Sequence, residues 1–254
     1  MGLMVVNGKQ FPVDLVVFDK DGLMFKSQGF WVELAETRMR MMREEVSAEI
    51  CAKWAKIFGV SMEDGHAVWI DPKGTFATAS PAEEIAVTAG IIIEFTGLNW
   101  AEARALAVKI FTAADDRLDL RRALRPQEGF PEIFERLRAA GIPYAVATSD
   151  TRDRVHSSLE MFGAQLPPEE LIVTPENVKR GKPNPDMLQV CEKVSGIPAA
   201  RMVMVGDSFV DVQMAYEAGA IGVGIPETDE MREKMGSFAT VIVNSLNDLT
   251  FVAE

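Results

Sequence analysis

Short apolar runs alternate along this chain with longer amphipathic segments. The first run, Leu15 to Phe18, lies in VDLVVFD and ends abruptly at charged residues. Short β-branched and apolar runs with polar exits are typical of strands that are buried on both faces of a parallel sheet. The same pattern recurs in PYAVATSD, LIVTPEN, MVMVGDS and IGVGIPE, and a weaker sixth run, TVIV, begins at Thr240. The pattern therefore predicts five strands and a weaker sixth.

Helical patterns fill the intervals between these runs, over residues 130–140, 152–161, 185–195 and 210–218. Strands that alternate with helices of this length indicate βαβ units and a parallel sheet. Gly141 and Gly219 follow two of the helices, at positions where a helix commonly ends in a left-handed residue. An α/β fold is the expected class for this part of the chain.

The segment between the first strand and residue 125 has a different character, because it contains no convincing buried strand. Glu33 to Val46 is rich in Glu, Arg, Met and Ala, which favour helix. SPAEEIAVTAGIIIEF begins with a capping box, and Trp100 to Arg117 is predicted to form a further helix. We therefore expect an α/β core of residues 1–24 and 125–254, with an all-helical domain of residues 25–124 inserted after the first strand.

Composition and charge narrow the classes of function. The chain has 254 residues, of which 48% are hydrophobic and 25% charged, as in globular proteins. Its net charge of -12 argues against a nucleic-acid partner, which needs a basic surface. Cys51 and Cys191 lie far apart and are interpreted as plain thiols in a reducing, cytoplasmic compartment. We expect neither a signal peptide nor a membrane span, and nothing in the sequence predicts an oligomeric state.

Polar residues stand at or shortly after the predicted strand ends. Ligands bind beyond the carboxyl ends of the strands in open α/β sheets, so these residues are expected to converge: Asp19, Asp21, Thr148, Ser149, Lys182, Asp207 and Asp211. Carboxylates that lie close together repel one another, and a hard cation such as Mg²⁺ relieves this conflict through oxygen ligands. Together with a hydroxyl from Thr148 and the charge of Lys182, such a site suits phosphoryl transfer.

The same residues carry a resemblance to a known family. FDKDGLM, VATSD, RGKPNPDM and VGDSFVDVQMAYEAGA occur in this order. Together they resemble the four signature motifs of the haloacid dehalogenase-like hydrolase superfamily, over Leu15 to Leu23 and Phe130 to Ile225. The inserted segment is similar to the helical caps of this superfamily only in position, size and helical character. Leu23 stands where the family has Thr or Val, and an apolar residue is tolerated there. The resemblance implies a Rossmann-like, doubly wound parallel sheet.

The resemblance also implies a role for each motif residue. Asp19 would be the nucleophile, and Asp21 the general acid and base, with its backbone carbonyl on the metal. Lys182 would neutralise charge, while Thr148 and Ser149 would bind the phosphoryl group. Asp207 would ligate Mg²⁺ directly, and Asp211 would hold a metal-bound water. An Asp at position 21 favours phosphate esters over carbon–halogen bonds. The remaining motif residue, Lys20, is interpreted as structural or solvent-facing.

Each of these residues also has a structural interpretation, as a strand-end turn, a helix cap or a solvated loop residue. In the inserted segment, a few residues are polar or aromatic enough to line a substrate pocket, although a solvated face or a domain core explains them equally well: His66, Trp69, Lys73, Arg117 and Arg121. The sequence thus predicts a Mg²⁺-dependent phosphatase that hydrolyses a small phosphorylated metabolite through an aspartyl-phosphate. A phosphomutase on the same scaffold and a non-catalytic regulatory protein are the alternatives.

Overall fold

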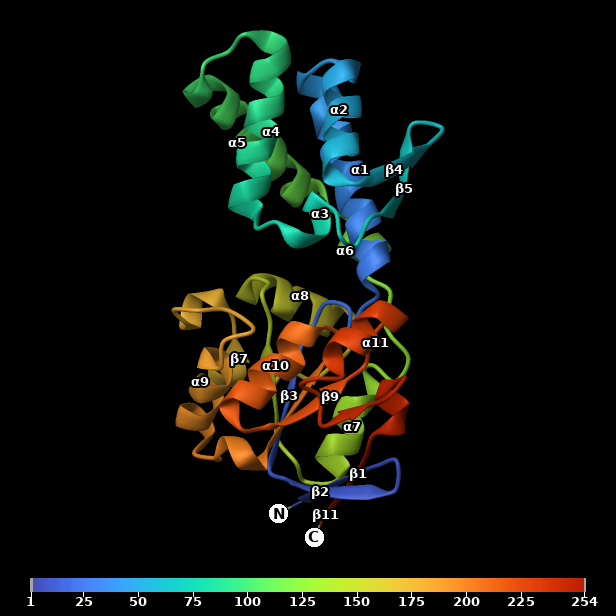
Figure 1. Cartoon of the computed structure of the whole chain (residues 1–254), viewed down its shortest axis with the longest axis vertical. Coiled ribbons are helices and arrows are strands. Elements are labelled where there is room, and N and C mark those ends of the chain that lie inside the picture. Colours follow the sequence, from blue (N-terminus) through green and yellow to red (C-terminus); the bar gives the residue numbers. More distant parts are fainter. Residues whose placement is uncertain (1, 254) are drawn as a thin grey trace. The chain divides into compact units, whose positions relative to one another are not determined.

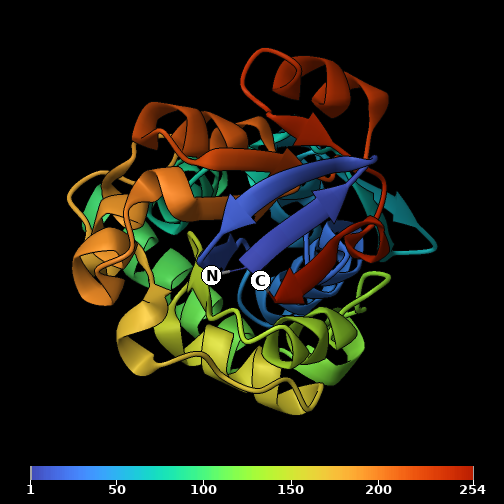
Figure 2. The ribbon, with the colours of Figure 1, turned by 90° about the horizontal axis from the view of Figure 1, so that it is seen from below.

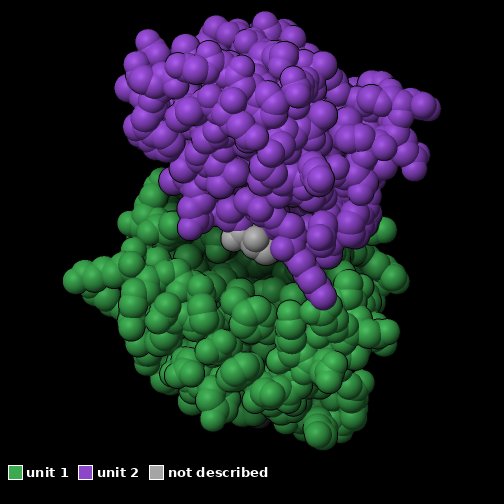
Figure 3. Space-filling model, turned by 45° about the horizontal axis from the view of Figure 1, so that its top comes forward, with its two compact units in different colours: residues 1–26, 126–254 green, residues 27–125 purple. Residues whose placement is uncertain are grey.

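The computed structural model describes residues 2–253, except for the side chain of Thr78. The chain divides into two compact units, shown in different colours in Figure 3. We call Met1–Lys26 together with Pro126–Glu254 the core unit, and Ser27–Arg125 the inserted unit. Each unit has its own hydrophobic core and is described by itself.

The core unit is built on a parallel sheet of six strands, drawn in the lower half of Figure 1. Its strands are β3 (Leu15–Phe18), β6 (Tyr144–Ala147), β7 (Ile172–Val173), β8 (Met202–Gly206), β9 (Ile221–Gly224) and β10 (Val241–Ile242). Their order in the sheet is β10-β9-β8-β3-β6-β7, so β3 is central. All six strands predicted from the sequence are present, and the expected doubly wound α/β class is confirmed.

All residues of strand β3 are apolar, and all of them are buried. Val17 belongs to the face covered by α9 (Asp186–Ser195) and α10 (Phe209–Ala218). Phe18 belongs to the opposite face, where its ring lies 5.4 Å from that of Phe134 on α7 (Glu132–Ala139). The remaining core helices are α8 (Arg152–Met161) and α11 (Asp229–Met235). This two-sided burial is the reason that β3 shows a continuous apolar run rather than alternation.

Two glycines that follow helices of the core unit adopt the left-handed backbone conformation. Gly141, just beyond α7, and Gly219, which ends α10, have φ values of 68° and 75°, as their positions after predicted helices suggest. The described part of the core unit also contains four single-turn 3-10 helices: η1 (Glu169–Leu171), η2 (Pro175–Asn177), η3 (Ala199–Arg201) and η4 (Leu246–Asp248).

A second, antiparallel sheet was not predicted. It consists of β1 (Gly2–Val6), β2 (Lys9–Val13) and β11 (Thr250–Ala253), in the order β11-β1-β2. Figure 2 shows these blue and red strands side by side near the two ends of the chain. The turn between β1 and β2 is Asn7-Gly8, with both φ values positive, which is the preferred chemistry of a two-residue hairpin turn.

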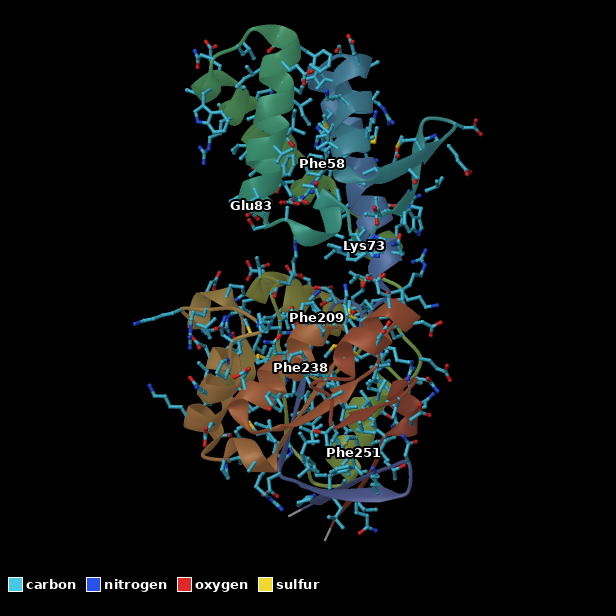
Figure 4. All side chains as sticks on the ribbon, viewed as in Figure 1. Phe58, Lys73, Glu83, Phe209, Phe238 and Phe251 are labelled. Atoms are coloured by element: carbon cyan, nitrogen blue, oxygen red, sulfur yellow. The ribbon has the colours of Figure 1, made fainter. Side chains whose placement is uncertain are left out.

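The inserted unit is mainly helical. Its helices are α1 (Ser27–Glu45), α2 (Ala48–Phe58), α3 (Thr75–Thr78), α4 (Pro81–Thr96), α5 (Trp100–Arg117) and α6 (Leu120–Ala123). The capping box predicted at Ser80 and Glu83 begins α4. Trp54 stacks on Phe58 with ring centroids 4.5 Å apart, and Phe58 points into the middle of the unit (Figure 4). A buried ion pair joins α1 to α4, with Arg38 Nη1 2.9 Å from Glu84 Oε2.

The expectation that this domain is all-helical is wrong. An antiparallel hairpin, β4 (Val60–Glu63) and β5 (His66–Ile70), follows α2. Its turn is Asp64-Gly65, and both residues have positive φ. Asp-Gly flanked by mixed apolar and polar residues is a strong hairpin signal, which the helix-forming composition around it obscured. No helix in residues 2–253 combines the length and the apolar character that crossing a bilayer requires.

Candidate active site

The central strands place a group of polar loops at one edge of the parallel sheet. Strand β3 pairs with β8 on one side and with β6 on the other. Later strands of the chain therefore lie on both sides of β3, and the strand order reverses at this point. Such a reversal opens a crevice at the carboxyl ends of the strands. The backbone N–H of Asp19 donates to the carbonyl of Val205 at 2.9 Å, which ties the loop after β3 to β8. Asp19 is thereby held at the reversal.

Three carboxylates meet at this edge. Asp19 follows β3, Asp207 follows β8, and Asp211 lies in the first turn of α10; one oxygen from each lies within 4.8 Å of the others. Two glycines make room for them. A Cβ on Gly22, whose φ is 86°, would lie 2.0 Å from Asp207 Oδ2, and one on Gly206 would lie 2.2 Å from Asp211 Cβ. The loops can approach this closely only because both positions lack a side chain.

Lys182 joins two of these carboxylates. Its Nζ lies 2.6 Å from Asp19 Oδ1 and 2.6 Å from Asp211 Oδ1. Only 4% of its side chain is exposed, so little solvent screens either contact. The other oxygen of Asp211 accepts from the backbone N–H and the hydroxyl of Ser208, which closes a capping box at the start of α10. Asp211 thus serves as a helix cap and as an anchor for Lys182 at once.

The protonation of this cluster reflects burial and mutual repulsion. Burial raises the pKa of Asp19 to about 6, with Lys182 opposing the shift and Asp211 adding to it. Burial likewise raises the pKa of Asp207, and the charges of Asp19, Asp211 and Glu227 raise it further. Burial lowers the pKa of Lys182, but the charges of Asp19 and Asp211 more than offset this effect, so its pKa is higher than usual and the ammonium stays charged.

These residues fit a divalent metal ion. Carboxylate oxygens are the ligands that Mg²⁺ and Ca²⁺ prefer. With Asp19, Asp207 and Asp211 ionised and Lys182 protonated, the cluster carries a formal charge of −2, which one divalent cation would balance. Burial and the neighbouring carboxylates raise the pKa of Asp207, so a cation held here would favour its ionised form.

Asp207→Asn is expected to stabilise the metal-free protein. A carboxyl group whose pKa is higher in the folded than in the unfolded state supports folding while it is protonated and loses that contribution as the pH rises through the folded value. Burial and the neighbouring carboxylates therefore make this carboxyl group unfavourable for folding at pH values above the usual pKa of aspartate, and its replacement by a neutral amide should raise the free energy of unfolding at pH 7.5 by about 1–3 kcal/mol. Urea unfolding in EDTA measures this change, and the stabilisation of the wild type by added Mg²⁺ should shrink in the variant.

Asp14→Asn provides a matched control with the opposite sign. Asp14 lies just before β3, at the strand end far from the cluster, and accepts from Arg201 at 2.8 and 2.9 Å. The hydrogen bond from Arg201 holds the pKa of Asp14 below its usual value, so loss of this charge should destabilise the protein slightly. A destabilised Asp207→Asn protein in EDTA would contradict the electrostatic account of the cluster.

Thr148 and Ser149 lie beyond the end of β6. Thr148 is buried, and its N–H donates to the carbonyl of Val173 at 3.1 Å. Its Oγ1 accepts from the backbone N–H of Asp150 at 3.1 Å. Ser149 is exposed. The loop extends from β6, which is the strand beside β3 on the side away from β8.

The carboxylate of Asp21 lies outside the acidic group formed by the described residues. It contacts Lys20 instead, with Lys20 Nζ 2.5 Å from Asp21 Oδ1 and 3.0 Å from Asp150 Oδ2. Of the two interpretations of Lys20, structural or solvent-facing, the solvent-facing one is wrong, because its side chain is only 2% exposed. Burial lowers the pKa of Lys20, but the charges of Asp21 and Asp150 outweigh it and the pKa is raised. Ligation of a metal by the Asp21 carbonyl stays a prediction.

Two further residues border the site and were not predicted. Gln127 Nε2 donates to the carbonyl of Gly22 at 2.9 Å and to Glu227 Oε1 at 2.7 Å. Glu227 adds negative charge near Asp207 and raises its pKa. Glu227 ends the run IGVGIPE, so its place after a strand was a usable signal. Gln127 carried no signal, because an isolated glutamine is common in loops.

Two of the five candidates in the inserted unit have surface partners. His66 Nδ1 lies 3.1 Å from Glu36 Oε1, and Arg117 Nη1 lies 3.3 Å from Glu44 Oε1. Trp69 is 45% exposed, so the alternative of a domain core does not apply to it. Trp54 fills that core instead. Lys73 and Arg121 are exposed. A pocket role for these residues stays a prediction.

Two curated relatives match parts of the chain. Hexitol phosphatase A of Escherichia coli K12 is 31% identical over 121 residues, which are 46% of this chain and 53% of that protein. A phosphoglycolate phosphatase of Neisseria meningitidis is 36% identical over 89 residues, 35% of this chain and 37% of that protein. The matches thus span about half the length of these relatives, or less.

The whole fold has relatives among solved structures. A predicted phosphoglycolate phosphatase from Haemophilus somnus superposes with a TM-score of 0.61 at 17% identity, over 93% of this chain and 96% of that one. At this identity the likeness concerns the fold alone. The sequence profile of the haloacid dehalogenase-like hydrolases matches residues 13–219, which include the first three motifs, the fourth motif up to Gly219, and every residue of the acidic cluster. The chain therefore belongs to the haloacid dehalogenase-like hydrolase family.

Proposed function

We propose that this protein is a Mg²⁺-dependent phosphatase that hydrolyses small phosphorylated metabolites with Asp19 as the nucleophile. The observation that carries the proposal is the position of Lys182, whose ammonium bridges Asp19 and Asp211 beside Asp207. A carboxylate nucleophile and a phosphate dianion repel each other, and a buried cation between them offsets this repulsion.

The reaction has two steps in this proposal. An oxygen of Asp19 attacks phosphorus, a new P–O bond forms, and the bond to the leaving oxygen breaks while Asp21 gives that oxygen a proton. Asp21 then takes a proton from water, the water oxygen attacks phosphorus, and the bond to Asp19 breaks. Inorganic phosphate leaves, and both carboxyl groups return to their initial state. Thr148 and the backbone N–H of Ser149 bind the phosphoryl oxygens.

The cation would be held by Asp19 and Asp207, together with the main-chain carbonyl of Asp21, and Asp211 would hold a water bound to it. When bound, Mg²⁺ neutralises charge on the phosphoryl oxygens. The residues themselves supply the rest of the chemistry. Lys182 keeps Asp19 ionised, because it is the strongest influence that lowers the raised pKa of Asp19.

The family and its relatives support the proposed substrate class. The curated relatives are named for hexitol phosphates and phosphoglycolate, which are small phosphate esters. An acidic chain with a net charge of -12 favours a substrate whose phosphate is met locally by Lys182 and a cation, rather than by a broad basic surface. Cys51 and Cys191 are buried free thiols, in keeping with the expected cytoplasmic location.

Metal removal provides the direct test. The purified chain is incubated with a panel of sugar phosphates, phosphoglycolate and nucleotides, with Mg²⁺ or with EDTA, and both free phosphate and isomerised sugar phosphate are measured. We expect phosphate release with Mg²⁺, a loss of at least about 10²-fold in EDTA, and recovery with excess Mg²⁺. Isomerised product without phosphate release would favour a phosphomutase, and no turnover of any ester would favour a non-catalytic protein. Activity unchanged by EDTA would contradict the metal site.

A further inference from the structure

Lys20 is a charged side chain with an unusually enclosed position. It stands between Asp19 and Asp21 in the sequence, yet only 2% of its side chain is exposed. Its Nζ lies 2.5 Å from Asp21 Oδ1, 3.0 Å from Asp150 Oδ2 and 5.9 Å from the centroid of the Phe25 ring. Two carboxylates and an aromatic face thus surround the ammonium.

Burial of an ammonium group costs free energy unless the group is paired with an anion. Even a well-formed buried ion pair often adds little to the free energy of unfolding. An apolar side chain of similar length would fill the same space beside Phe25 without this cost. The specific gain from a lysine here is orientation, because a buried ammonium fixes the rotamers of the carboxylates that it contacts. The carboxylate with most to gain is that of Asp21, whose side chain is 37% exposed.

Lys20 also connects two loops that leave different strands. Asp21 belongs to the loop after β3, and Asp150 to the loop after β6. Asp150 is held on its own side as well, because its Oδ1 accepts from the N–H of Thr151 at 2.7 Å and lies 3.5 Å from Arg154 Nη1. The ammonium therefore connects Asp21 to a carboxylate whose own position is fixed.

This connection extends to Thr148. The backbone N–H of Asp150 donates to Thr148 Oγ1 at 3.1 Å. A hydroxyl that accepts one hydrogen bond keeps its own proton for donation. The backbone N–H of Asp150 thus orients the Thr148 hydroxyl. Lys20 contacts the side chain of the same Asp150 and also that of Asp21.

We propose that Lys20 is a positioning residue, which holds Asp21 at the leaving-group oxygen and fixes the loop that carries Thr148. The proposal rests on the proposed phosphatase function. Lys20 does not touch the substrate in this account. It holds Oδ1 of Asp21, and Oδ2 then exchanges the proton with the leaving oxygen and with water.

The test uses Lys20→Met and two esters that differ in their need for a proton donor. An alkyl phosphate, the best substrate of the panel, has a poor leaving group that must be protonated, whereas p-nitrophenyl phosphate has a good one that need not be. We expect kcat/KM for the alkyl phosphate to fall about 10²-fold and that for p-nitrophenyl phosphate to fall less than about threefold. Asp150→Asn, which removes only one partner of Lys20, should give the same preference at about threefold to tenfold.

Arg201→Met is the matched control, since it removes a cation from the ion pair with Asp14, before the opposite end of β3. It should leave both values of kcat/KM unchanged. An equal loss for both esters in Lys20→Met, or no loss, would overturn the proposal. If Lys20→Met does not fold, the outcome is decided by Asp150→Asn, where an equal loss or no loss overturns it too. A wild type that hydrolyses neither ester would instead refute the phosphatase function itself.

Discussion

Replacing Asp19 with Asn is expected to abolish turnover and leave the protein folded. The substitution keeps the size of the side chain, but an amide does not attack phosphorus, so the first covalent step has no nucleophile. Loss of a nucleophile typically costs at least about 10⁴-fold in kcat. The fold should persist, because Asp19 contributes no apolar packing and its backbone N–H bond to Val205 is unaffected. Phosphate release and a urea unfolding curve on the same preparation measure both outcomes.

Two companion variants make the result decisive. Asp14→Asn makes the same chemical change just before the opposite end of β3, and its activity should match the wild type. Asp19→Ala excludes residual activity from slow conversion of Asn back to Asp. If Asp19→Asn kept more than about a hundredth of wild-type kcat with Asp19→Ala equally active, another group would be the nucleophile. If it were inactive only because it had unfolded, the experiment would test stability rather than chemistry.

The parallel sheet was predictable because each of its strands carries its own signal. A strand buried on both faces must be apolar throughout, and a loop at its carboxyl end must be polar, so LVVF followed by Asp19 indicates both at once. Even Val241–Ile242, only two residues long, was visible as TVIV. Helices between the strands then required parallel pairing.

The two hairpins were missed for a different reason. Val60–Glu63 and His66–Ile70 alternate only partly between buried and exposed residues, and Ser61/Met62 carries a register shift that interrupts the alternation. The β1-β2 hairpin looks like an irregular terminus until β11 pairs with it from the far end of the chain. In both cases the turn dipeptides, Asn7-Gly8 and Asp64-Gly65, were the usable local signal.

The acidic cluster could be predicted because its members follow strands that the fold brings together. Lys20 could not, since the burial of a lysine depends on partners elsewhere in the chain. Its second partner, Asp150, is 130 positions away in the sequence. A residue type that is nearly always exposed is assigned to the surface by default, and only a three-dimensional structure reveals the exception.

Lys182→Met is expected to damage both activity and metal-free stability. Lys182 is the cation that contacts Asp19 and Asp211 at 2.6 Å, and its removal leaves buried carboxylates uncompensated. Breaking a buried pair in this way costs about 3–5 kcal/mol. Loss of a charge that neutralises the reacting phosphoryl group should lower kcat by about 10³-fold. Steady-state kinetics with Mg²⁺ and urea unfolding in EDTA measure the two effects.

The stability loss should depend on pH in a defined direction. The pKa of Asp19 is about 6 with Lys182 in place, and Lys182 is the strongest influence that lowers it. Without Lys182 the folded pKa lies higher still. A carboxyl group with a raised folded pKa loses its contribution to stability as the pH rises through that value, so the variant should be far closer to the wild type at pH 5 than at pH 8. Added Mg²⁺ should narrow the difference at pH 8, because it replaces the missing positive charge.

Arg180→Met separates this effect from a general response of the loop. Arg180 lies two positions before Lys182 and pairs with Asp186 on the surface, with Nη2 2.6 Å from Oδ1. Its loss should change stability little and show no such pH dependence, since an exposed pair is worth little. An equal loss of stability at pH 5 and pH 8 in Lys182→Met would mean that the lysine acts through packing. The expected divergence between these two pH values would instead identify Lys182 as the charge that keeps Asp19 ionised beside Asp211.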